Sequence, residues 1–345
     1  MGKAKQRHRE IYKPKPEFVE RMEKLLGSKQ EAEKFFEICK TETPDSIRCN
    51  TLKISPEELK QRLEQYGWKI VQPFENNKEI MIIDETNNGG GRKLAPGELG
   101  KTQEHLLGYY YVQEISSMLP LFVLQPKPNE IFLDLCASPG SKPTQASAYM
   151  ENTGLIIAND NNLGRIRILN SNLEKCGVMN AIVTRSDGVK LCNNLLKRSN
   201  LKFDKILVDA PCSGEGTLRK SPKTYLMWNL NMVHKLGSIQ KRLASSALRL
   251  LKVGGEMIYS TCTLTPEEDE EVINYLLERF DIQIEEINLP LKRHCGVCEW
   301  DGKKLNQQIK NSCRIYPQDN NTDGFFLAKI KKLSDKEKEI GERRK

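Results

Sequence analysis

From about residue 131 the chain alternates short apolar runs with longer amphipathic segments. The runs that we predict to be strands cover residues 131–137, 154–159, 180–185, 205–208 and 256–260. Short continuous apolar runs are typical of strands that are covered on both faces, and the segments between them are long enough for crossover helices. This alternation predicts an α/β domain with a mostly parallel, doubly wound sheet.

Before residue 105 the pattern is different and predicts a small α+β domain. Residues 17–39 have apolar positions at helical spacing. Strand-like runs follow at residues 47–53, 68–74 and 80–84. Ser55, followed by Pro56 and Glu58, is typical of a helix start, and we expect this helix to end at Gly67. We therefore expect an N-terminal α+β domain over residues 17–104.

The remaining segments complete the predicted organisation. Residues 105–124, rich in tyrosine, are expected to be helical and to open a second domain that extends to residue 332. Residues 1–16 are basic and interrupted by proline, which predicts a flexible arm, and residues 87–91 predict a loop. The chain from Lys331 mixes both charge signs, so we expect a solvated, partly helical end, with residues 333–345 as a tail.

Composition is that of a globular protein with a mild basic excess. The 345 residues are 38% hydrophobic and 29% charged, with a formal net charge of +8. This excess is compatible with a nucleic-acid partner but does not require one. In the N-terminal domain Arg48, Lys53, Arg62, Lys69 and Arg92 are either a basic face or ordinary surface charges.

The ten cysteines are scattered, which favours reduced thiols in an intracellular protein. The chain has no apolar run that approaches a membrane span, and its first residues lack the apolar segment of a signal peptide. We expect a cytoplasmic monomer, nuclear if the source is eukaryotic, with no membrane partner.

A nucleotide-binding turn follows the first predicted strand. Residues 134–144 (DLCASPGSKPT) combine a strand end, a tight turn at Gly140 and a helix start. Asp160 and Asp187 follow the second and third strands, where they can bind a ribose and an adenine, although either is also a plausible helix cap. The fingerprint G-x-G-x-x-G is absent, which favours S-adenosylmethionine over a nicotinamide dinucleotide.

Two further strand ends carry cysteines. Cys212 lies in the motif DAPCSG (residues 209–214), and Cys262 lies in the motif STC (residues 260–262). A thiolate beside a methyl donor indicates methylation of carbon 5 of a pyrimidine, because addition of the thiolate at carbon 6 makes carbon 5 nucleophilic. Asp209 can offset the charge at ring nitrogen 3 if it is protonated or shares a proton, and Lys142 can lower a thiol pKa if it reaches the site. From the residues alone, either cysteine is a candidate for the attack.

These motifs resemble the RNA cytosine-C5 methyltransferases of the Sun/Fmu type, most closely the tRNA-modifying branch. The likeness covers about residues 45–332 and includes CSGEGTLRK (212–220), WN (228–229), YSTCT (259–263) and TDGFFLAK (322–329). It implies a Rossmann-like, seven-stranded sheet preceded by an RNA-binding module that includes residues 48–53. It also implies RNA as the partner, with tRNA as the expected class.

The resemblance also implies roles for individual residues. Cys262 would be the nucleophile, Cys212 would assist release of the RNA, Asp209 would hold the cytosine edge, and Lys142 would orient the site. The residues implied to line the S-adenosylmethionine pocket are Asp134, Cys136, Ala137, Ser138, Pro139, Gly140, Lys142, Asp160, Arg165, Asp187 and Asp209. Pro143 departs from the threonine usual in the family, so the helix start is expected to shift and the cofactor contacts to loosen.

Several alternatives remain open at this point. His294, Cys295, Cys298 and Cys313 include a C-x-x-C, but the set is cramped and incomplete, so we predict no metal site. The substrate could be rRNA instead of tRNA. A non-catalytic RNA-binding factor with the same fold is opposed by the intact Asp209, Cys212 and Cys262, and a nicotinamide oxidoreductase by the missing glycines.

Overall fold

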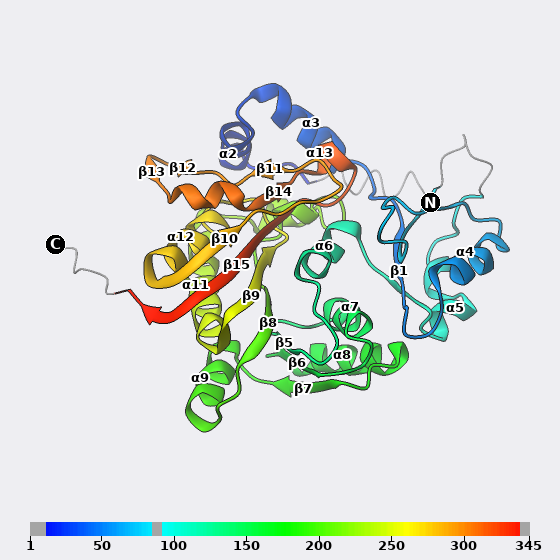
Figure 1. The fold of residues 1–345 in the computed structure, drawn as a ribbon. Helices are drawn as coiled ribbons and strands as arrows, with labels where there is room; N and C mark the ends of the chain where they lie inside the picture. The colour runs from blue at the N-terminus through cyan, green and yellow to red at the C-terminus, as the bar shows by residue number, and fades with distance from the viewer. Residues whose placement is uncertain (1–11, 85–91, 339–345) are drawn as a thin grey trace.

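The computed structural model describes residues 12–84 and 92–338, which form a large mixed sheet covered by helices and a smaller sheet at one side (Figure 1). The predicted loop at 87–91 and most of the predicted basic arm lie outside the described residues. The first helix of the described residues, α2, begins at Pro16, and Lys15 just before it donates from Nζ to the carbonyl oxygen of Trp228 at 2.7 Å.

Five strands form the parallel half of the large sheet, as the sequence predicted. They pair in the order β7-β6-β5-β8-β9, and every neighbouring pair among them is parallel. Their bounds are β5 Ile131–Asp134, β6 Leu155–Asp160, β7 Ala181–Arg185, β8 Phe203–Asp209 and β9 Leu251–Thr261. Crossover helices connect successive strands, so the carboxyl ends of all five strands meet at one edge of the sheet.

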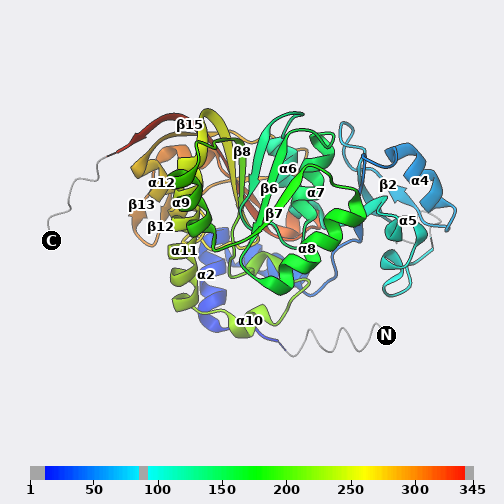
Figure 2. The ribbon, with the colours of Figure 1, turned by 90° about the horizontal axis from the view of Figure 1, so that it is seen from below.

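Alternate residues of each strand enter two different cores, which explains the continuous apolar runs. Phe132 packs with one cluster and Leu133 with the other, and Leu207 and Val208 divide in the same way. One face is covered by α6 Ile115–Leu124, α7 Ser141–Tyr149 and α8 Leu163–Cys176, and the other by α9 Gly188–Arg198, α11 Leu230–Leu250 and α12 Glu270–Arg279 (Figure 2). No helix within 12–84 and 92–338 is long and apolar enough to cross a membrane.

The other half of the sheet is antiparallel and larger than expected. The long strand β15 Phe325–Glu337 pairs with β9 on one side, and on the other with β14 Cys313–Ile315 and then β10 Phe280–Glu285. β11 His294–Cys295 extends β14, so the described sheet has nine strands where seven were predicted. A separate hairpin joins β12 Glu299–Trp300 and β13 Lys303–Lys304.

The prediction of a partly helical end from Lys331 was wrong over residues 331–337, although residues 335–338 are exposed as predicted; residues 339–345 lie outside the described residues. Residues 331–337 continue β15, because β10 supplies backbone partners for them, with Ile282 opposite Lys332 and Phe280 opposite Glu337. Lys332 is 4% exposed, and its ammonium group donates to the carbonyl oxygens of Leu248 and Leu251. Hydrogen bonds to a neighbouring strand thus override the helical preference of a segment rich in Lys and Glu.

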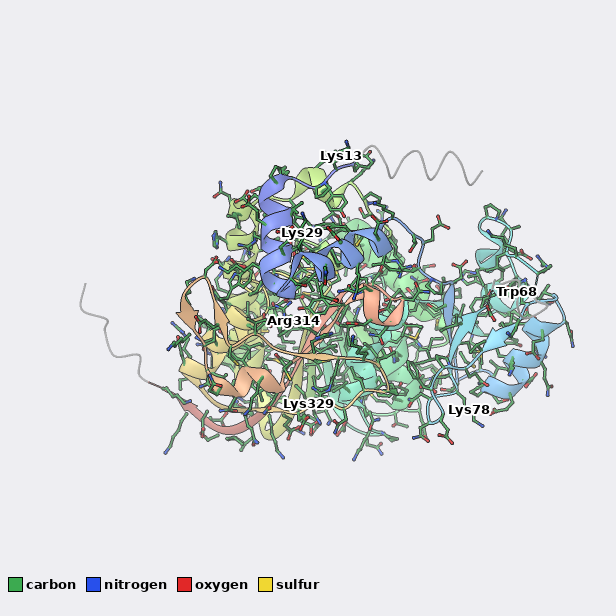
Figure 3. The ribbon with its side chains drawn as sticks, turned by 90° about the horizontal axis from the view of Figure 1, so that it is seen from above. Lys13, Lys29, Trp68, Lys78, Arg314 and Lys329 are labelled. Atoms are coloured by element: carbon green, nitrogen blue, oxygen red, sulfur yellow. The ribbon has the colours of Figure 1, made fainter. Side chains whose placement is uncertain are left out.

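The small sheet is antiparallel, with the order β2-β3-β1-β4. Its strands are β1 Ser46–Cys49, β2 Ile70–Val71, β3 Ile80–Ile83 and β4 Tyr110–Val112, and α4 Pro56–Glu64 packs beside them. The prediction of a helix throughout 105–124 was wrong in its first half. The structure has the short helix α5 Gln103–Leu106 and then β4, since Tyr110, Tyr111 and Val112 lie opposite β1. Trp68 and Lys78 lie in this module, on the side of the molecule away from Arg314 and Lys329 (Figure 3).

The two N-terminal helices pack on the large domain. The predicted helical stretch 17–39 is split into α2 Pro16–Leu26 and α3 Lys29–Cys39 at Gly27, which has the positive φ of 78° that favours glycine. Phe18, Met22 and Phe35 belong to a cluster with Leu218, Trp228 and Tyr316 (and Val233 and Leu264). The predicted domain boundaries remain predictions, but these helices contact the elements that carry the cysteine motifs.

Arg48 is a buried link between the two sheets and not part of a basic face. It is 2% exposed, stacks on Tyr111 with its guanidinium carbon 5.5 Å from the ring centroid, and donates to the Ser141 carbonyl and the Thr144 hydroxyl at 2.7 Å each. Of the other four residues of the proposed basic face, three form ion pairs within the module: Arg62 with Glu58, Lys69 with Asp84, and Arg92 with Glu98. The fourth, Lys53, donates to two backbone carbonyl oxygens. A buried cation with several acceptors fixes the small module against the start of α7.

Candidate active site

The strand register brings the predicted site residues to one edge of the sheet. Asp134 ends β5 opposite Leu207 of β8, and Asp209 ends β8 opposite Ser260 of β9. Asp160 ends β6 on the other side of β5. Because these strands are parallel, their last residues and the loops that follow them lie together.

The sulfur atoms of Cys212 and Cys262 lie 3.3 Å apart. This separation is much longer than a disulfide bond of about 2.05 Å, and both cysteines are free thiols with partly exposed side chains. The hydrogen bond with Cys262 and burial raise the pKa of Cys212 well above its usual value. Cys212 therefore stays protonated, and the two thiols share a hydrogen bond in which either sulfur can be the donor.

Lys142 and Asp209 form an ion pair next to the thiols. The Lys142 ammonium lies 2.8 Å from Asp209 Oδ2, and the Ser260 hydroxyl donates to Asp209 Oδ1 at 2.8 Å. Burial lowers the pKa of Lys142, but Asp209 more than offsets this, so the pKa is raised and the group stays charged. The charge of Lys142 also interacts with Cys262. The pair thus holds a fixed hydrogen-bond donor and a fixed acceptor beside the two sulfur atoms. A site that binds a pyrimidine ring needs such groups to balance the charge that develops on the ring.

The turn after β5 is built as a cradle for a ligand. Gly140 has a φ of 109°, a backbone conformation that disfavours any residue with a side chain. A Cβ at this position would also lie only 3.2 Å from the Leu169 side chain. Arg165 Nη2 donates to the Ser138 carbonyl at 2.8 Å and, in return, the Ser138 hydroxyl donates to the Arg165 carbonyl at 2.9 Å. The side chains of Cys136, Ala137 and Pro139 belong to the same turn, and α7 starts directly after it.

Two carboxylates face this turn. Asp134 is fully buried, and burial raises its pKa to about 7, against the opposing effect of Lys142. Its Oδ2 has no hydrogen-bond partner among the described residues, which fits a ligand that donates a proton there. Asp160 accepts from the backbone amide of Asn162 at 3.0 Å, and its other oxygen lies 3.4 Å from Arg165. These residues fit a nucleoside cofactor with donor groups on its sugar and its amino-acid end.

Asp187 and Pro143 both lie at helix starts, of α9 and α7 respectively. Asp187 caps α9 by accepting from the Lys190 amide at 3.0 Å, so the helix-cap interpretation holds, and its role toward a cofactor remains a prediction. The expectation that Pro143 shifts the helix start and loosens cofactor contacts remains a prediction. α7 starts at Ser141, and Pro143 occupies its first turn, where a backbone N–H has no partner within the helix.

The acidic run after Cys262 leads into the start of α12, and most of it is buried. Glu267, Glu268, Asp269 and Glu270 are at most 4% exposed. Each has its own partner: Glu267 pairs with Arg21, Glu268 accepts from the Ser213 amide, Asp269 accepts from Thr261, and Glu270 pairs with Arg314. Four consecutive acids in the interior were the signal that sequence reasoning missed, and Glu268 is the one that contacts the Cys212 loop.

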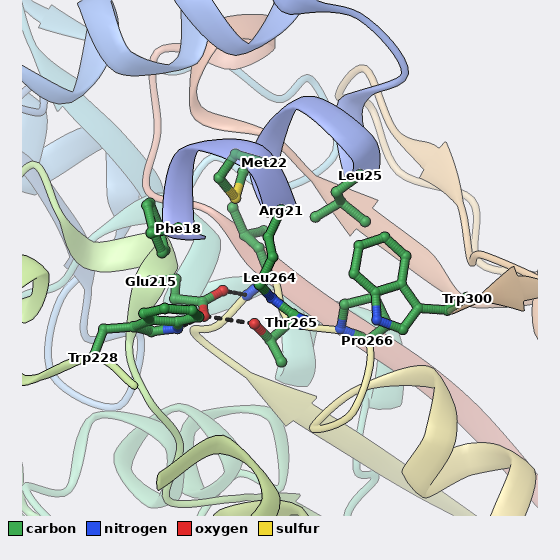
Figure 4. A pocket seen from close by; sticks show the side chains of 10 residues that line it. All are labelled: Phe18, Arg21, Met22, Leu25, Glu215, Trp228, Leu264, Thr265, Pro266 and Trp300. Carbon is green, nitrogen blue, oxygen red and sulfur yellow. Dashed lines mark hydrogen bonds between the residues drawn. The ribbon is translucent and has the colours of Figure 1, made fainter. Parts of the chain in front are cut away.

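Glu215 joins the loops that follow the two cysteines, and helix α2 packs over this contact (Figure 4). Buried Glu215, three residues after Cys212, accepts from the Trp228 indole and the Thr265 hydroxyl at 2.5 Å each and from the Leu264 amide at 3.3 Å. Phe18 packs edge-on to Trp228, with their ring centroids 5.1 Å apart. Both strand-end loops are therefore fixed by one carboxylate under the N-terminal helix.

No group of three or more His, Cys, Asp or Glu side chains within 12–84 and 92–338 is arranged to hold a metal ion. His294 instead bonds Asp319 at 2.7 Å, and Cys313 is buried opposite the exposed Cys295.

Comparisons with known proteins agree with this site. A family model described as 16S rRNA methyltransferase RsmB/F matches residues 121–331, and one described as the N-terminal domain of 16S rRNA methyltransferase RsmF matches residues 15–115. The chain is 40% identical over 323 residues to a tRNA (cytosine(49)-C(5))-methyltransferase of Pyrococcus abyssi, covering 94% of this chain and 98% of that one. It is 37% identical over 332 residues to ribosomal RNA small subunit methyltransferase F of Vibrio cholerae, covering 95% of this chain but 65% of that longer protein.

Solved structures show the same fold. A methyltransferase homologue from Pyrococcus horikoshii superposes with a TM-score of 0.75 at 33% identity, covering 92% of this chain and 100% of that chain. NSun6 from Pyrococcus horikoshii, solved with SFG, has a TM-score of 0.77 at 24% identity and covers 93% of this chain and 98% of that chain. The family model over residues 121–331 and the Pyrococcus abyssi relative show that the chain belongs to the RsmB/F (Sun/Fmu) family of S-adenosylmethionine-dependent RNA cytosine-C5 methyltransferases.

Proposed function

We propose that this protein methylates carbon 5 of cytosine in tRNA through a covalent adduct between Cys262 and carbon 6 of the base. The observation that carries the proposal is the 3.3 Å separation of the Cys212 and Cys262 sulfur atoms beside the Lys142–Asp209 pair. A single thiol would suffice for attack. A second thiol at that distance fits a reaction in which this group, once ionised, removes a proton before the first thiol can leave.

Each residue then has a defined task. The Cys262 thiolate attacks carbon 6, and the Lys142–Asp209 pair holds the edge of the base and balances the charge that develops on the ring. Bound S-adenosylmethionine supplies the methyl group, and Asp134, Asp160 and the 135–140 turn would hold it at the ends of β5 and β6. Once it has lost its own proton, Cys212 takes the proton from carbon 5, the electrons of that C–H bond restore the double bond between carbons 5 and 6, and Cys262 leaves as a thiolate. The target base must leave its stack to reach the two sulfurs.

The choice of tRNA is supported by the Pyrococcus abyssi relative, which matches this chain over nearly its whole length and is named as a tRNA methyltransferase. The rRNA alternative is supported by the RsmF relatives, of which this chain spans about two thirds or less. Purified protein with tritiated S-adenosylmethionine should label bulk tRNA well above rRNA, and bisulfite sequencing should place the product at cytosines. Labelling of rRNA alone would exclude tRNA, and no labelling of either would favour a non-catalytic RNA-binding factor.

Asp160→Ala is expected to weaken S-adenosylmethionine binding about 10- to 100-fold, because a hydrogen bond to a charged group contributes about 1.5–3 kcal/mol. Isothermal titration calorimetry measures this directly. Asp204→Ala is the matched control, because Asp204 lies on β8 but toward the opposite end of the sheet, paired with Lys252. Equal affinities in both variants would remove Asp160 from the cofactor site.

A further inference from the structure

The carboxylate of Glu268 is fixed against the chain on both sides of Cys212. Its Oε2 accepts from the Ser213 amide at 3.1 Å and from Gln240 Nε2 at 2.8 Å. The same Gln240 nitrogen donates to the Pro211 carbonyl at 2.9 Å. Glu268 therefore contacts the residue after Cys212 directly and the residue before it through Gln240.

The second oxygen of this carboxylate is free to take a proton. Glu268 is fully buried, and its Oε1 has no hydrogen-bond partner among the described residues. A buried acceptor without a donor is destabilising, so it needs a reason to persist. Burial raises the pKa of Glu268 to about 7, while the donors Ser213 and Gln240 lower it in part, so the group can gain and lose a proton near neutrality.

Cys212 and Glu268 are coupled through charge. The hydrogen bond with Cys262 contributes most to the raised pKa of Cys212, followed by burial, the charge of Cys262 and the charge of Glu268. Two of these four effects end when the sulfur of Cys262 is bonded to carbon 6, because a thioether carries no charge and accepts hydrogen bonds weakly. The thiol of Cys212 then becomes easier to deprotonate at the stage when a base is needed.

We propose that Glu268 is the proton acceptor that converts Cys212 from thiol to thiolate once Cys262 is bonded to the base. This inference rests on the proposed function and extends it. The S–H bond of Cys212 breaks and an O–H bond forms on Glu268. The Cys212 thiolate then takes the proton from carbon 5, the electrons of that C–H bond form the double bond between carbons 5 and 6, and Cys262 leaves as a thiolate. Glu268 finally releases its proton to water, which accounts for the one proton produced in each turnover.

Other titratable groups surround Glu268 and bear on its pH response. Cys212 and Glu215 lie on the loop after β8. Tyr259 of β9 donates to the Glu268 carbonyl. Asp269 is the next residue in the chain and is paired with Arg314 of β14. Gln240 of α11 carries no charge. Tyr259 has a pKa raised well above its usual value, so it does not account for a transition near pH 7. Burial also raises the pKa of Asp269 well above its usual value, against the opposing effect of Arg314, so the comparison with Glu268→Gln is what assigns the transition to Glu268.

Glu268→Gln keeps the shape of the side chain and removes its ability to accept a proton. We expect the covalent protein–RNA adduct to form at the normal rate, and its release to slow by about 10- to 100-fold. In the native protein release should be fast above about pH 7 and slow below it, because only the deprotonated carboxylate accepts a proton. In Glu268→Gln release should be slow and independent of pH between about 6 and 8. Single-turnover experiments with denaturing gels measure both steps.

Two further variants keep the test decisive. Glu267→Gln is the matched control, an identical change at the adjacent buried acid, which pairs with Arg21 and bonds Trp300 instead; its release rate should match that of the native protein. Gln240→Leu removes one donor from Glu268, so the pKa rises and the midpoint of the pH profile should move upward. The shift of this midpoint tests the role of Glu268 even if Glu268→Gln does not fold.

Normal release with an unchanged pH profile in Glu268→Gln, or an unshifted midpoint in Gln240→Leu, would overturn the proposal. The double variant Cys212→Ala with Glu268→Gln should release no more slowly than Cys212→Ala alone, since both act on one step. Absence of any adduct in Cys212→Ala would instead contradict the proposed covalent function, so the two failures are distinguishable.

Discussion

Cys262→Ala is expected to abolish methyl transfer, with turnover reduced on the order of 10⁴-fold or more, while S-adenosylmethionine still binds with nearly native affinity. Without the thiolate, carbon 5 of cytosine is too weak a nucleophile to take the methyl group. The proposed cofactor site is built from β5, β6 and the turn at Gly140, and Cys262 contributes no hydrogen bond to it among the described contacts. Rate measurements with tritiated donor, together with calorimetry, separate these two effects.

The matched control for this experiment is Cys295→Ala. Cys295 is an exposed free thiol on β11, which is separated from β9 by β14 and β15, and its replacement should leave turnover unchanged. Retained turnover in Cys262→Ala, with the activity instead lost in Cys212→Ala, would reverse the assignment of the two sulfurs. Loss of cofactor binding in Cys262→Ala would mean that the variant tests the cofactor site and not the attack.

Cys212→Ala is expected to accumulate a covalent protein–RNA adduct that survives denaturant. Attack by Cys262 and methyl transfer do not need the second thiol, but removal of the proton from carbon 5 does, so release should slow on the order of 10²–10⁴-fold. A denaturing gel with labelled tRNA should show a slowly migrating band that ribonuclease removes. The raised pKa of Cys212 fits this assignment, because a group that stays protonated beside Cys262 is not itself the attacking thiolate.

The adduct must depend on the other sulfur. The double variant Cys212→Ala with Cys262→Ala should give no band. Cys192→Ala changes a buried core cysteine of α9 and, compared at a temperature where both proteins are folded, should behave as the native protein does. A Cys212→Ala protein that releases methylated tRNA at the native rate would contradict a role for this thiol in release. Growth of the band with the amount of RNA, at fixed protein, excludes aggregation as its source.

Local pattern was sufficient for much of the fold. The five parallel strands, the turn at Gly140 and the helix after Ser55 follow from apolar runs and from residues with strong backbone preferences, which act within a few positions of the chain. The motifs around Cys212 and Cys262 also indicated a shared edge, because parallel strands end on the same side of a sheet. These features are encoded within windows of about ten residues, so the sequence alone was enough to predict them.

Other features depend on partners that are distant along the chain. Tyr110–Val112 is a strand because β1 lies beside it, and residues 331–337 continue a strand because β10 does. Arg48 and the acids from Glu267 to Glu270 are charged types that a pattern assigns to the surface, yet each is buried with a partner. Burial of a charge depends on whether a distant group can compensate it, and no local window contains that information.

The two cysteines illustrate the division between sequence and structure. Their motifs, 50 residues apart, indicated the chemistry. Their 3.3 Å separation, the raised pKa of Cys212 and the unpaired carboxylate oxygen of Glu268 arise only when β8, β9 and α11 pack together. Residue types and their short-range spacing predict which reactions are available. Distances, burial and the resulting proton affinities are properties of the packed molecule, because they are set by the atoms that surround each group in space.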